Sequence, residues 1–281
     1  MRVVKGLLSR CVAVIELMAA GTTPLRLSEI AQALDLPKSA THRLLRELVA
    51  LDWVTQEAAE GRYRLSLRFA LLGSRGLWAT GLPELARPLL RALADATREL
   101  VRMTLASGEG LSWIAAAQGA PPGLMYQPAM DGKLVLHATA NGKAYLAALA
   151  PEPALRLARQ GGLGEVRLTP ATLHAEEALR TELDRIRLAG YAVAVEEAEP
   201  GVTAVAVAIV PVGCGPVGTV SVAGPSLRLT PARIPDLAAR LAETAAALAS
   251  GWPIAPMAAP GPPDRMRVSQ NRQTRGGAAR L

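Results

Sequence analysis

Histidine and cysteine, which serve as metal ligands and nucleophiles, are few in this chain of 281 residues, and they do not cluster. No metal-ligand spacing joins the histidines and cysteines, which are His42, His137, His174, Cys11 and Cys214. The two cysteines belong to no Cys-x-x-Cys pair, so the sequence predicts neither a disulfide framework nor a zinc site. We therefore expect no metal, no cofactor and a reducing cytoplasm as the location.

One acidic cluster could be interpreted as paired carboxylates for acid–base catalysis: Glu196, Glu197 and Glu199. Because adjacent residues of a strand point to opposite faces, an acidic loop or a structural ion pair is the favoured interpretation. The glycine run at 161–164 follows no strand and lacks a phosphate-loop lysine. We expect no catalytic residue, and a hydrolase or transferase is the least favoured function.

The strongest chemical pattern is a basic helix at residues 37–53, PKSATHRLLRELVALDW, in which Pro37 suits the first helical position. Apolar residues at helical spacing would face a small core: Ala40, Leu44, Leu48 and Leu51. The other positions carry polar and basic side chains that can reach bases or phosphates in a major groove: Lys38, Ser39, Thr41, His42, Arg43 and Arg46.

The segment before this helix indicates that the basic helix is the second helix of a helix-turn-helix motif. Residues 27–34 predict a shorter amphipathic helix, with Ser28 as its cap and Glu29 in its first turn. Residues 35–37 then make the bend. Two short helices joined by a tight turn, the second of them basic at its start, are typical of DNA-binding proteins.

The following segment predicts a wing. Two β-prone runs, at 53–56 and 62–65, flank a turn that ends in Gly61. Such a hairpin would place Arg62 and Arg64 beside the duplex. An ordinary helical core with a solvated basic face is the alternative, and the order helix, turn, helix, hairpin disfavours it.

The net charge of +7 is unevenly distributed along the chain. Residues 1–75 hold 11 Lys and Arg against 7 Asp and Glu, and residues 252–281 hold 5 against 1. Residues 76–251 hold 15 against 16 and are nearly neutral. This asymmetry fits attraction of phosphates by a first domain and another role for the second. The last segment is rich in Pro, Gly, Gln and Arg, and we expect it to be disordered.

The rest of the chain predicts an α+β sensor-type domain behind a linker. Further helices are expected at 7–20, 82–100, 138–149, 173–189 and 232–249, and Pro88 predicts a kink or a late start in the second of these. Strands are expected at 101–105, 111–115, 193–195, 202–210 and 217–222. The uncharged stretch 202–224 is long enough to cross a bilayer, but its central prolines and glycines favour two buried strands instead.

Several motifs, in order, resemble the IclR family of bacterial transcriptional regulators over roughly residues 4–251. They are LSEIAQALDLPKSATHRLLREL, GRYRLSLRFALLG, LHATANGKAYLAAL, RLAGYAVAVEEAEPGVTAVAVAIV and VSVAGPSLRLT. The resemblance implies an α+β fold with an N-terminal winged helix-turn-helix, linker helices and a C-terminal GAF-like effector-binding domain. We place these parts at 1–67, 68–100 and 101–251, with the tail at 252–281.

The resemblance also implies partners. Family members bind palindromic double-stranded DNA operators as homodimers or homotetramers and respond to small organic acids or aromatic catabolites. We expect no membrane partner. A dimer would place residues 37–50 of each chain in successive major grooves. Arg43 and Arg46 would contact bases or phosphates, and Arg62 and Arg64 would grip the flanking backbone.

The same resemblance places the effector pocket at Thr139, Ala140, Asn141, Ala194, Ala204 and Ser221. This chain departs from the family at Ala194, where an acidic residue is frequent, at Ala204, where a polar residue is frequent, and at Ala223. Because an unpartnered buried polar group costs on the order of 1–3 kcal/mol, fewer polar groups predict a more apolar cavity. We expect an effector less polar than a short oxoacid, for example an aromatic one.

Three classes of function follow. A ligand-responsive DNA-binding regulator is favoured, a small-molecule-binding module without DNA binding is second, and an enzyme is third. A gel shift against the upstream region of the chain's own gene separates the first two classes.

Overall fold

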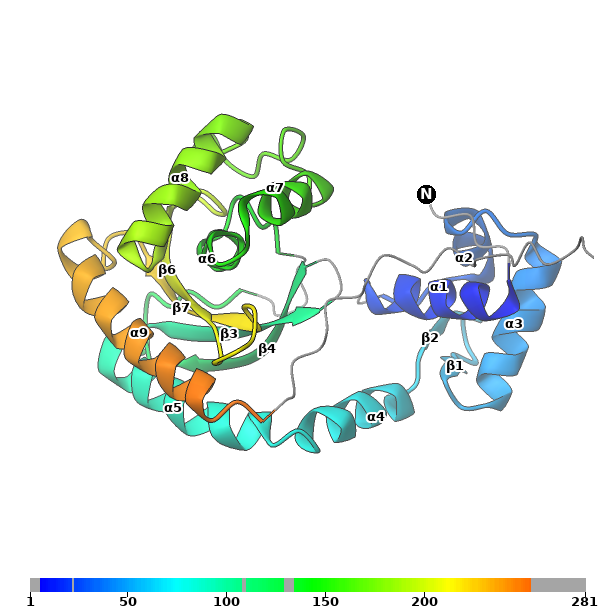
Figure 1. Ribbon diagram of the computed structural model, residues 1–281. Helices are drawn as coiled ribbons and strands as arrows, with labels where there is room; N and C mark the ends of the chain where they lie inside the picture. The colour runs from blue at the N-terminus through cyan, green and yellow to red at the C-terminus, as the bar shows by residue number, and fades with distance from the viewer. Residues whose placement is uncertain (1–5, 22, 108–109, 129–133, 254–281) are drawn as a thin grey trace, which may run out of the picture.

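The computed structural model describes residues 6–21, 23–107, 110–128 and 134–253, and most of the C-terminal segment predicted to be disordered lies outside these residues. Two lobes are joined by a helical linker (Figure 1). The N-terminal lobe contains α1 (Leu7–Ala19), α2 (Leu27–Ala33), α3 (Lys38–Ala50), β1 (Val54–Gln56) and β2 (Tyr63–Leu65). Its core is built from Val14, Met18, Ile30, Leu45, Leu48, Val54 and Tyr63.

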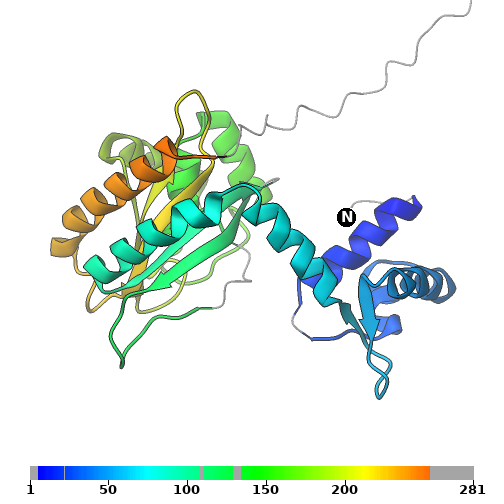
Figure 2. The ribbon, with the colours of Figure 1, turned by 90° about the horizontal axis from the view of Figure 1, so that it is seen from below.

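The predicted helix-turn-helix and hairpin are both present in the N-terminal lobe. Strands β1 and β2 pair antiparallel, with Thr55 opposite Arg64, and the hairpin projects from the lobe (Figure 2). Gly61 in its turn has a φ of +64°, which a side chain would disfavour. The backbone of Tyr63 also exchanges hydrogen bonds with Leu25, so the loop before α2 braces the wing.

Two local predictions about helix starts are wrong. Pro37 is the residue before α3 and not its first helical residue, because its carbonyl already accepts the first helical bond, from the Thr41 amide. Ser28 does not cap α2. The N-cap residue of α2 is Arg26, whose backbone amide donates to Glu29 Oε2 at 2.6 Å.

The linker consists of α4 (Leu67–Trp78) and α5 (Leu82–Thr97). Helix α5 begins at Leu82 with Pro83 in its first turn and continues past Pro88, so the late start that Pro88 predicted does not occur. Helix α4 buries none of its residues, whereas α5 buries one face against the C-terminal lobe.

The C-terminal lobe has a five-stranded antiparallel sheet in the order β4-β3-β7-β6-β5. The strands are β3 (Leu100–Ser107), β4 (Gly110–Gln118), β5 (Ala192–Val195), β6 (Val202–Ile209) and β7 (Gly218–Pro225). Strands β6 and β7 confirm that the uncharged stretch 202–224 forms two paired strands. No helix in the described part of the chain is long and apolar enough to cross a membrane.

Helices cover both faces of this sheet. Helices α5 and α9 (Ile234–Ser250, preceded by the 3₁₀ turn η1, Pro231–Arg233) lie side by side on one face (Figures 1 and 2). The other face carries α6 (Ala140–Ala147), α7 (Pro151–Gln160) and α8 (Glu176–Ala189). Each face has its own apolar core, and the sequence analysis missed α7.

Candidate functional site

The basic helix α3 exposes most of the side chains expected to meet DNA. Those exposed are Lys38, Ser39, His42, Arg43 and Arg46. Thr41 is the exception: it is fully buried, and its hydroxyl donates to the Pro37 carbonyl at 3.1 Å.

The expected DNA contact by Thr41 is therefore wrong, because the buried stripe of α3 is Thr41, Leu44, Leu45 and Leu48. The stripe proposed from the sequence also included Leu51, which is 59 % exposed. The other side of α3 faces solvent and carries both Arg43 and Arg46. A groove-reading role for these two arginines is thus compatible with the fold.

The two wing arginines differ in how they are held. Arg62 Nε lies 2.7 Å from Glu60 Oε2, and its Nη1 donates to the Pro24 carbonyl at 3.2 Å, so it ties the wing to the loop before α2. Arg64 is more exposed and lies 4.0 Å from Glu57. Arg64 is the more available of the two for a phosphate.

A small cavity of about 40 Å³ in the C-terminal lobe gathers five of the six predicted effector residues. These five are Thr139, Ala140, Asn141, Ala194 and Ala204. Ser221 is buried in β7, which pairs with β3, and its hydroxyl donates to the Arg102 carbonyl of β3 at 3.4 Å. Ser221 is not among the cavity-lining residues, which corrects the sequence-based assignment.

The same cavity is lined by residues that the sequence analysis missed: Arg102, Trp113, Tyr126, Ala198, Val202 and Ala223. Arg102 is only 9 % exposed, and its guanidinium carbon lies 3.8 Å from the centroid of the Trp113 ring and 5.8 Å from that of Tyr126. Its Nε is buried with no hydrogen-bond partner in the described part of the chain. The cavity therefore holds a cation that is not fully satisfied.

Burial shifts the pKa values of both Arg102 and Tyr126. It lowers the pKa of Arg102, although Tyr126 and Glu199 oppose the effect. Burial also raises the pKa of Tyr126 to about 12, so the phenol stays protonated and can donate a hydrogen bond. A buried arginine beside a neutral phenol and an indole can bind a carboxylate and an aromatic ring together.

The amino end of α6 is fixed in place at the cavity by short polar contacts. Thr139 caps the helix by accepting from the Gly142 amide at 3.1 Å. Asn141 Nδ2 donates to Thr219 Oγ1 at 2.8 Å, and Thr219 Oγ1 lies 2.6 Å from Thr104 Oγ1. A Cβ at Gly142 would overlap the backbone of Leu136, so the glycine permits α6 to approach the preceding segment closely.

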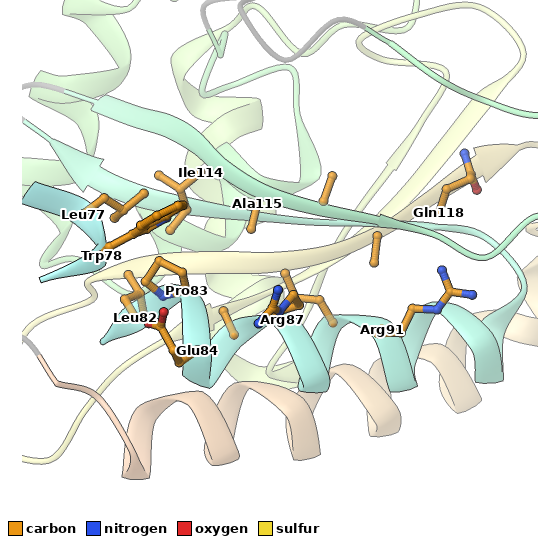
Figure 3. Close-up of a pocket in the computed structure, with 14 residues that line it drawn as sticks. Leu77, Trp78, Leu82, Pro83, Glu84, Arg87, Arg91, Ile114, Ala115 and Gln118 are labelled. Carbon is orange, nitrogen blue, oxygen red and sulfur yellow. The ribbon is translucent and has the colours of Figure 1, made fainter. Parts of the chain in front are cut away.

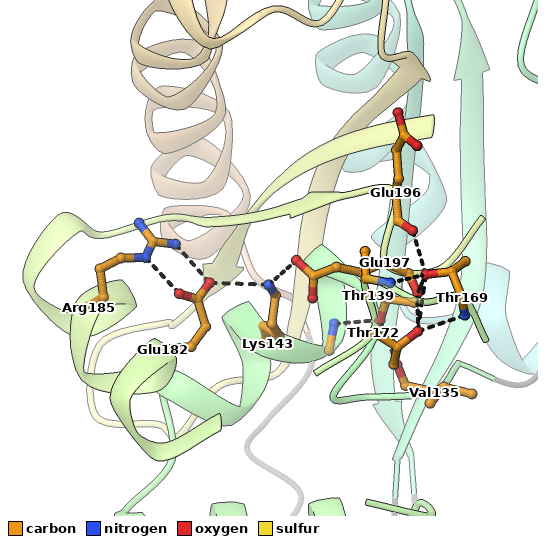
Figure 4. A network of polar contacts seen from close by, with 11 residues as sticks. Val135, Thr139, Lys143, Thr169, Thr172, Glu182, Arg185, Glu196 and Glu197 are labelled. Carbon is orange, nitrogen blue, oxygen red and sulfur yellow. Dashed lines mark hydrogen bonds and ion pairs between the residues drawn. The ribbon is translucent and has the colours of Figure 1, made fainter. Parts of the chain in front are cut away.

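A buried ion-pair network ties α6 to the loop after β5 (Figure 4). Lys143 Nζ lies between Glu197 Oε1, at 2.7 Å, and Glu182 Oε1, at 3.1 Å. Burial raises the pKa of Glu197, whereas hydrogen bonds from Arg185 and Lys143 outweigh burial at Glu182 and lower its pKa. The structural interpretation of the acidic cluster is thus confirmed for Glu197.

Two threonines fix the backbone of that loop. Thr169 Oγ1 donates to the Glu196 carbonyl at 2.7 Å, and Thr172 Oγ1 donates to the Glu197 carbonyl at 2.6 Å. The loop continues to Ala198 and Val202, which line the cavity. The network of Lys143 therefore positions two walls of the cavity relative to each other.

A second, larger depression of about 790 Å³ lies between α5 and the edge strand β4 (Figure 3). Leu77, Trp78 and Ile114 lie at one end, and Arg91 and Gln118 lie at the other. None of the predicted effector residues lines it. It is an open groove along the linker helix, distinct from the cavity at Arg102.

The winged helix-turn-helix, the helical linker and a sensor lobe with a cavity define a class of transcriptional regulator in which an effector-binding domain is joined to a DNA-binding domain. The family model for the IclR helix-turn-helix domain matches residues 7–58, and that for the C-terminal domain of bacterial IclR regulators matches residues 76–250. The chain belongs to the IclR family of bacterial transcriptional regulators.

Two known regulators are similar to this chain along most of their length. The chain is 32 % identical over 251 residues to the transcriptional regulator BhcR of Paracoccus denitrificans, covering 87 % of this chain and 86 % of that one. It is 30 % identical over 239 residues to the transcriptional repressor IclR of Escherichia coli, covering 85 % and 86 %. Since these relatives are transcriptional regulators, the prediction that the chain is no enzyme is confirmed.

Solved structures agree on the fold. A regulator of this family from a Silicibacter species has a TM-score of 0.80 at 24 % identity, covering 89 % of this chain and 98 % of that chain. An IclR homologue of Microbacterium hydrocarbonoxydans in complex with 4-hydroxybenzoate has a TM-score of 0.71 at 26 % identity, covering 87 % and 98 %.

Proposed function

We propose that this chain is a cytoplasmic, effector-controlled regulator that binds a palindromic operator as a homodimer or homotetramer. The DNA-binding unit is residues 1–67, the linker 68–100 and the effector-binding domain 101–251. Helix α3 enters the major groove with Arg43 and Arg46, supported by Lys38, Ser39 and His42, and Arg64 contacts the flanking phosphates. The solvent-exposed basic face of α3 supports this assignment.

Helix α4 supplies the contact with a second copy. Its described residues are all at least partly exposed, including Leu67 at 74 %, Leu71 at 50 %, Leu72 at 55 % and Trp78 at 66 %. Leu67, Leu71 and Trp78 recur at helical spacing, which is the pattern of a face that packs against another helix. Because a helix-turn-helix protein reads two half-sites through its two-fold symmetry, a second copy of α4 is the occupant that fits.

The effector is an aromatic carboxylate. Arg102 supplies the charge, Trp113 and Tyr126 supply aromatic faces, and Ala194 and Ala204 leave the remaining wall apolar. The expectation of a cavity poor in polar groups holds for those two alanines but missed the buried cation. The relative from Microbacterium hydrocarbonoxydans, seen with 4-hydroxybenzoate, supports the same class.

The cavity must widen to admit such an effector. Its volume of about 40 Å³ accommodates a few water molecules, since roughly 10–15 Å³ of such space holds one. An aromatic ring needs more room, and the segment that carries Tyr126 forms one wall. Binding therefore selects a conformation with this wall displaced, and only an effector that prefers that conformation can change the DNA affinity.

Two measurements test the proposal. Fluorescence anisotropy with DNA from upstream of the chain's own gene should show binding that weakens in Arg43→Ala. Calorimetric titration should show benzoate or 4-hydroxybenzoate binding at least roughly tenfold more tightly than neutral benzamide or glyoxylate. No binding to that DNA would favour a ligand-binding module without DNA binding, and a preference for glyoxylate or equal affinity for benzamide would overturn the effector class.

A further inference from the structure

We propose that Glu99, Arg228 and Arg233, here called the Glu99 cluster, form a relay that carries displacement of the Tyr126 wall of the cavity to the carboxyl end of the linker helix α5. The relay goes beyond the proposed function. It uses that function only in that Tyr126 borders the effector cavity, and its test needs neither operator nor effector.

Glu99 occupies the junction between the linker and the sensor sheet. Helix α5 ends at Thr97, Arg98 has a φ of +57°, and Leu100 begins β3. The Glu99 side chain is 1 % exposed, and Arg228 binds it with two charge-assisted hydrogen bonds, Nε to Oε1 and Nη2 to Oε2, each of 2.7 Å. A buried carboxylate of this kind is stable as an ion only while its cation stays in place.

The sheet leaves a specific space for this carboxylate. Gly224 of β7 lies directly against it, and a Cβ at Gly224 would overlap Glu99 Oε2 and the carboxyl carbon. The glycine is needed for close approach and not for an unusual backbone angle. Adding a methyl group there displaces Glu99 without removing any charge.

Arg228 also holds the cavity wall. Its remaining amine, Nη1, donates to the Leu124 carbonyl at 2.8 Å. Two residues further on, the Tyr126 ring lies beside the Arg102 guanidinium, and the Gln118 side chain donates to the Tyr126 carbonyl at 3.1 Å. One guanidinium group therefore bonds both the wall segment and the carboxylate at the end of the linker.

Arg233 extends the cluster onto α5 itself. Its Nη2 donates to the Thr97 carbonyl at 2.9 Å, and its Nη1 lies 3.8 Å from Glu99 Oε1. Arg233 belongs to η1, immediately before α9, which packs beside α5. The last turn of α5, the start of α9 and Glu99 are thus held as one unit.

These contacts give the relay its direction. When the wall moves to admit a ring, the Leu124 carbonyl pulls Arg228 Nη1 with it, and the geometry at Glu99 changes. Since the 16 residues of α5 form one continuous helix, a shift at its carboxyl end moves its amino end, which connects to α4 and the DNA-binding lobe.

Hydrogen exchange in the full-length protein tests the relay through one reporter amide. The amide of Arg98 donates to the Ala94 carbonyl at 2.8 Å and closes the last turn of α5. The amide of Gly190 closes α8 with the same left-handed geometry at 2.8 Å and serves as the internal control. Three single variants are compared: Arg228→Lys, Gly224→Ala and Tyr126→Ala. A double variant combines Tyr126→Ala with Arg228→Lys.

We expect each single variant to speed exchange of the Arg98 amide by roughly tenfold while the Gly190 amide changes little. The double variant should exchange no faster than the faster single variant, because both changes act through the same contact. Arg240→Lys, which alters an exposed ion pair with Asp236 on α9, is the matched control and should leave Arg98 unchanged.

Three results would overturn the relay: an unchanged Arg98 amide in Tyr126→Ala, effects that multiply in the double variant, or equal acceleration at Gly190, which reports general loosening. None of these results bears on whether α3 reads DNA or whether Arg102 binds a carboxylate.

Discussion

The guanidinium carbon of Arg102 lies 3.8 Å from the centroid of the Trp113 ring, inside a cavity whose other walls are largely alanine and valine. The indole face compensates part of the charge, since a desolvated cation–π contact is worth about 2 kcal/mol. It does not satisfy Arg102 Nε, which has no hydrogen-bond partner in the described residues. A carboxylate bound beside Arg102, as proposed for the effector, would relieve the cost of this unpaired group.

Replacing Arg102 by Met should separate binding from stability. Loss of one partner of a buried charge pair weakens carboxylate binding by roughly 2–5 kcal/mol, whereas binding of neutral benzamide should change little. The free energy of unfolding should change by no more than about 1 kcal/mol, because an apolar side chain of similar length replaces an incompletely paired charge. Calorimetric titration and urea unfolding measure the two effects.

Arg228→Met should lower the free energy of unfolding more than Arg102→Met does. It leaves the carboxylate of Glu99, which is 1 % exposed, without its main cation, and should cost roughly 3 kcal/mol. If Arg102→Met proved as destabilising as Arg228→Met, Arg102 would be a structural residue and not a ligand anchor.

Helix α3 offers a pair of substitutions that distinguish DNA contact from folding. Arg43→Ala should weaken operator binding by roughly 1–3 kcal/mol and relax specificity at one base position, if the side chain reads a base. Thr41→Val removes only the buried hydroxyl that donates to Pro37, so it should lower the free energy of unfolding by about 1 kcal/mol and leave operator affinity unchanged.

Anisotropy titrations and urea unfolding of both variants give the comparison. A Thr41→Val protein that is fully folded but binds the operator poorly would return Thr41 to the DNA-contacting face. An Arg43→Ala protein with wild-type affinity would remove that arginine from it.

The periodicity of apolar residues was sufficient to predict most helices and strands. It was not sufficient to predict which side of each helix is buried. The apolar spacing of residues 37–53 predicts a helix with a buried face, and α3 has one. Ala40 and Leu51 fit that spacing as well as Thr41 and Leu45 do, and the true face is fixed by packing against α1, α2 and β1. A threonine that satisfies its hydroxyl within its own helix can be buried, which hydrophobicity alone does not indicate.

The charged residues of the sensor lobe could not be placed from local sequence. Lys143 finds its carboxylates 39 and 54 residues away, and Arg102 meets Trp113 and Tyr126 only because β3 pairs with β4 and a loop folds back. One signal was present: Val101, Met103 and Leu105 alternate with other residues along the strand expected at 101–105. This alternation puts Arg102 on the opposite face.

Helix α4 gives a prediction about assembly. Leu71→Glu places a charge in the middle of the exposed apolar stripe, so burying it against a second copy becomes costly. The variant should dissociate toward monomers at concentrations at which the wild type is dimeric, as measured by light scattering coupled to gel filtration. Leu188→Glu, the same change at a leucine of α8 that is 92 % exposed, is the matched control. Dimers of unchanged stability in Leu71→Glu would place the interface elsewhere.

The two carboxylates that share Lys143 should respond to pH in opposite directions. Burial opposes ionisation of Glu182, but hydrogen bonds from Arg185 and Lys143 outweigh it and hold the pKa below the ordinary 4.5. Burial of Glu197 outweighs its contact with Lys143 and holds the pKa above 4.5. A lowered pKa contributes stability that is present above 4.5 and lost as the pH falls through the lowered value. A raised pKa contributes stability that is present below 4.5 and lost as the pH rises through the raised value.

Urea unfolding of Glu182→Gln and Glu197→Gln between about pH 3.5 and about pH 6.5 resolves the two signs. Each curve subtracted from that of the wild type reports the carboxylate removed, together with its coupling to the other carboxylate through Lys143. The stability that the wild type holds over Glu182→Gln should grow as the pH rises toward 4.5 and then level off. The stability that it holds over Glu197→Gln should shrink as the pH rises above 4.5. Glu177→Gln corrects for the loss of one exposed negative charge from α8. Two curves of the same sign would mean that Lys143 ionises both partners alike, and Glu197 would then be an ordinary ion pair despite its burial.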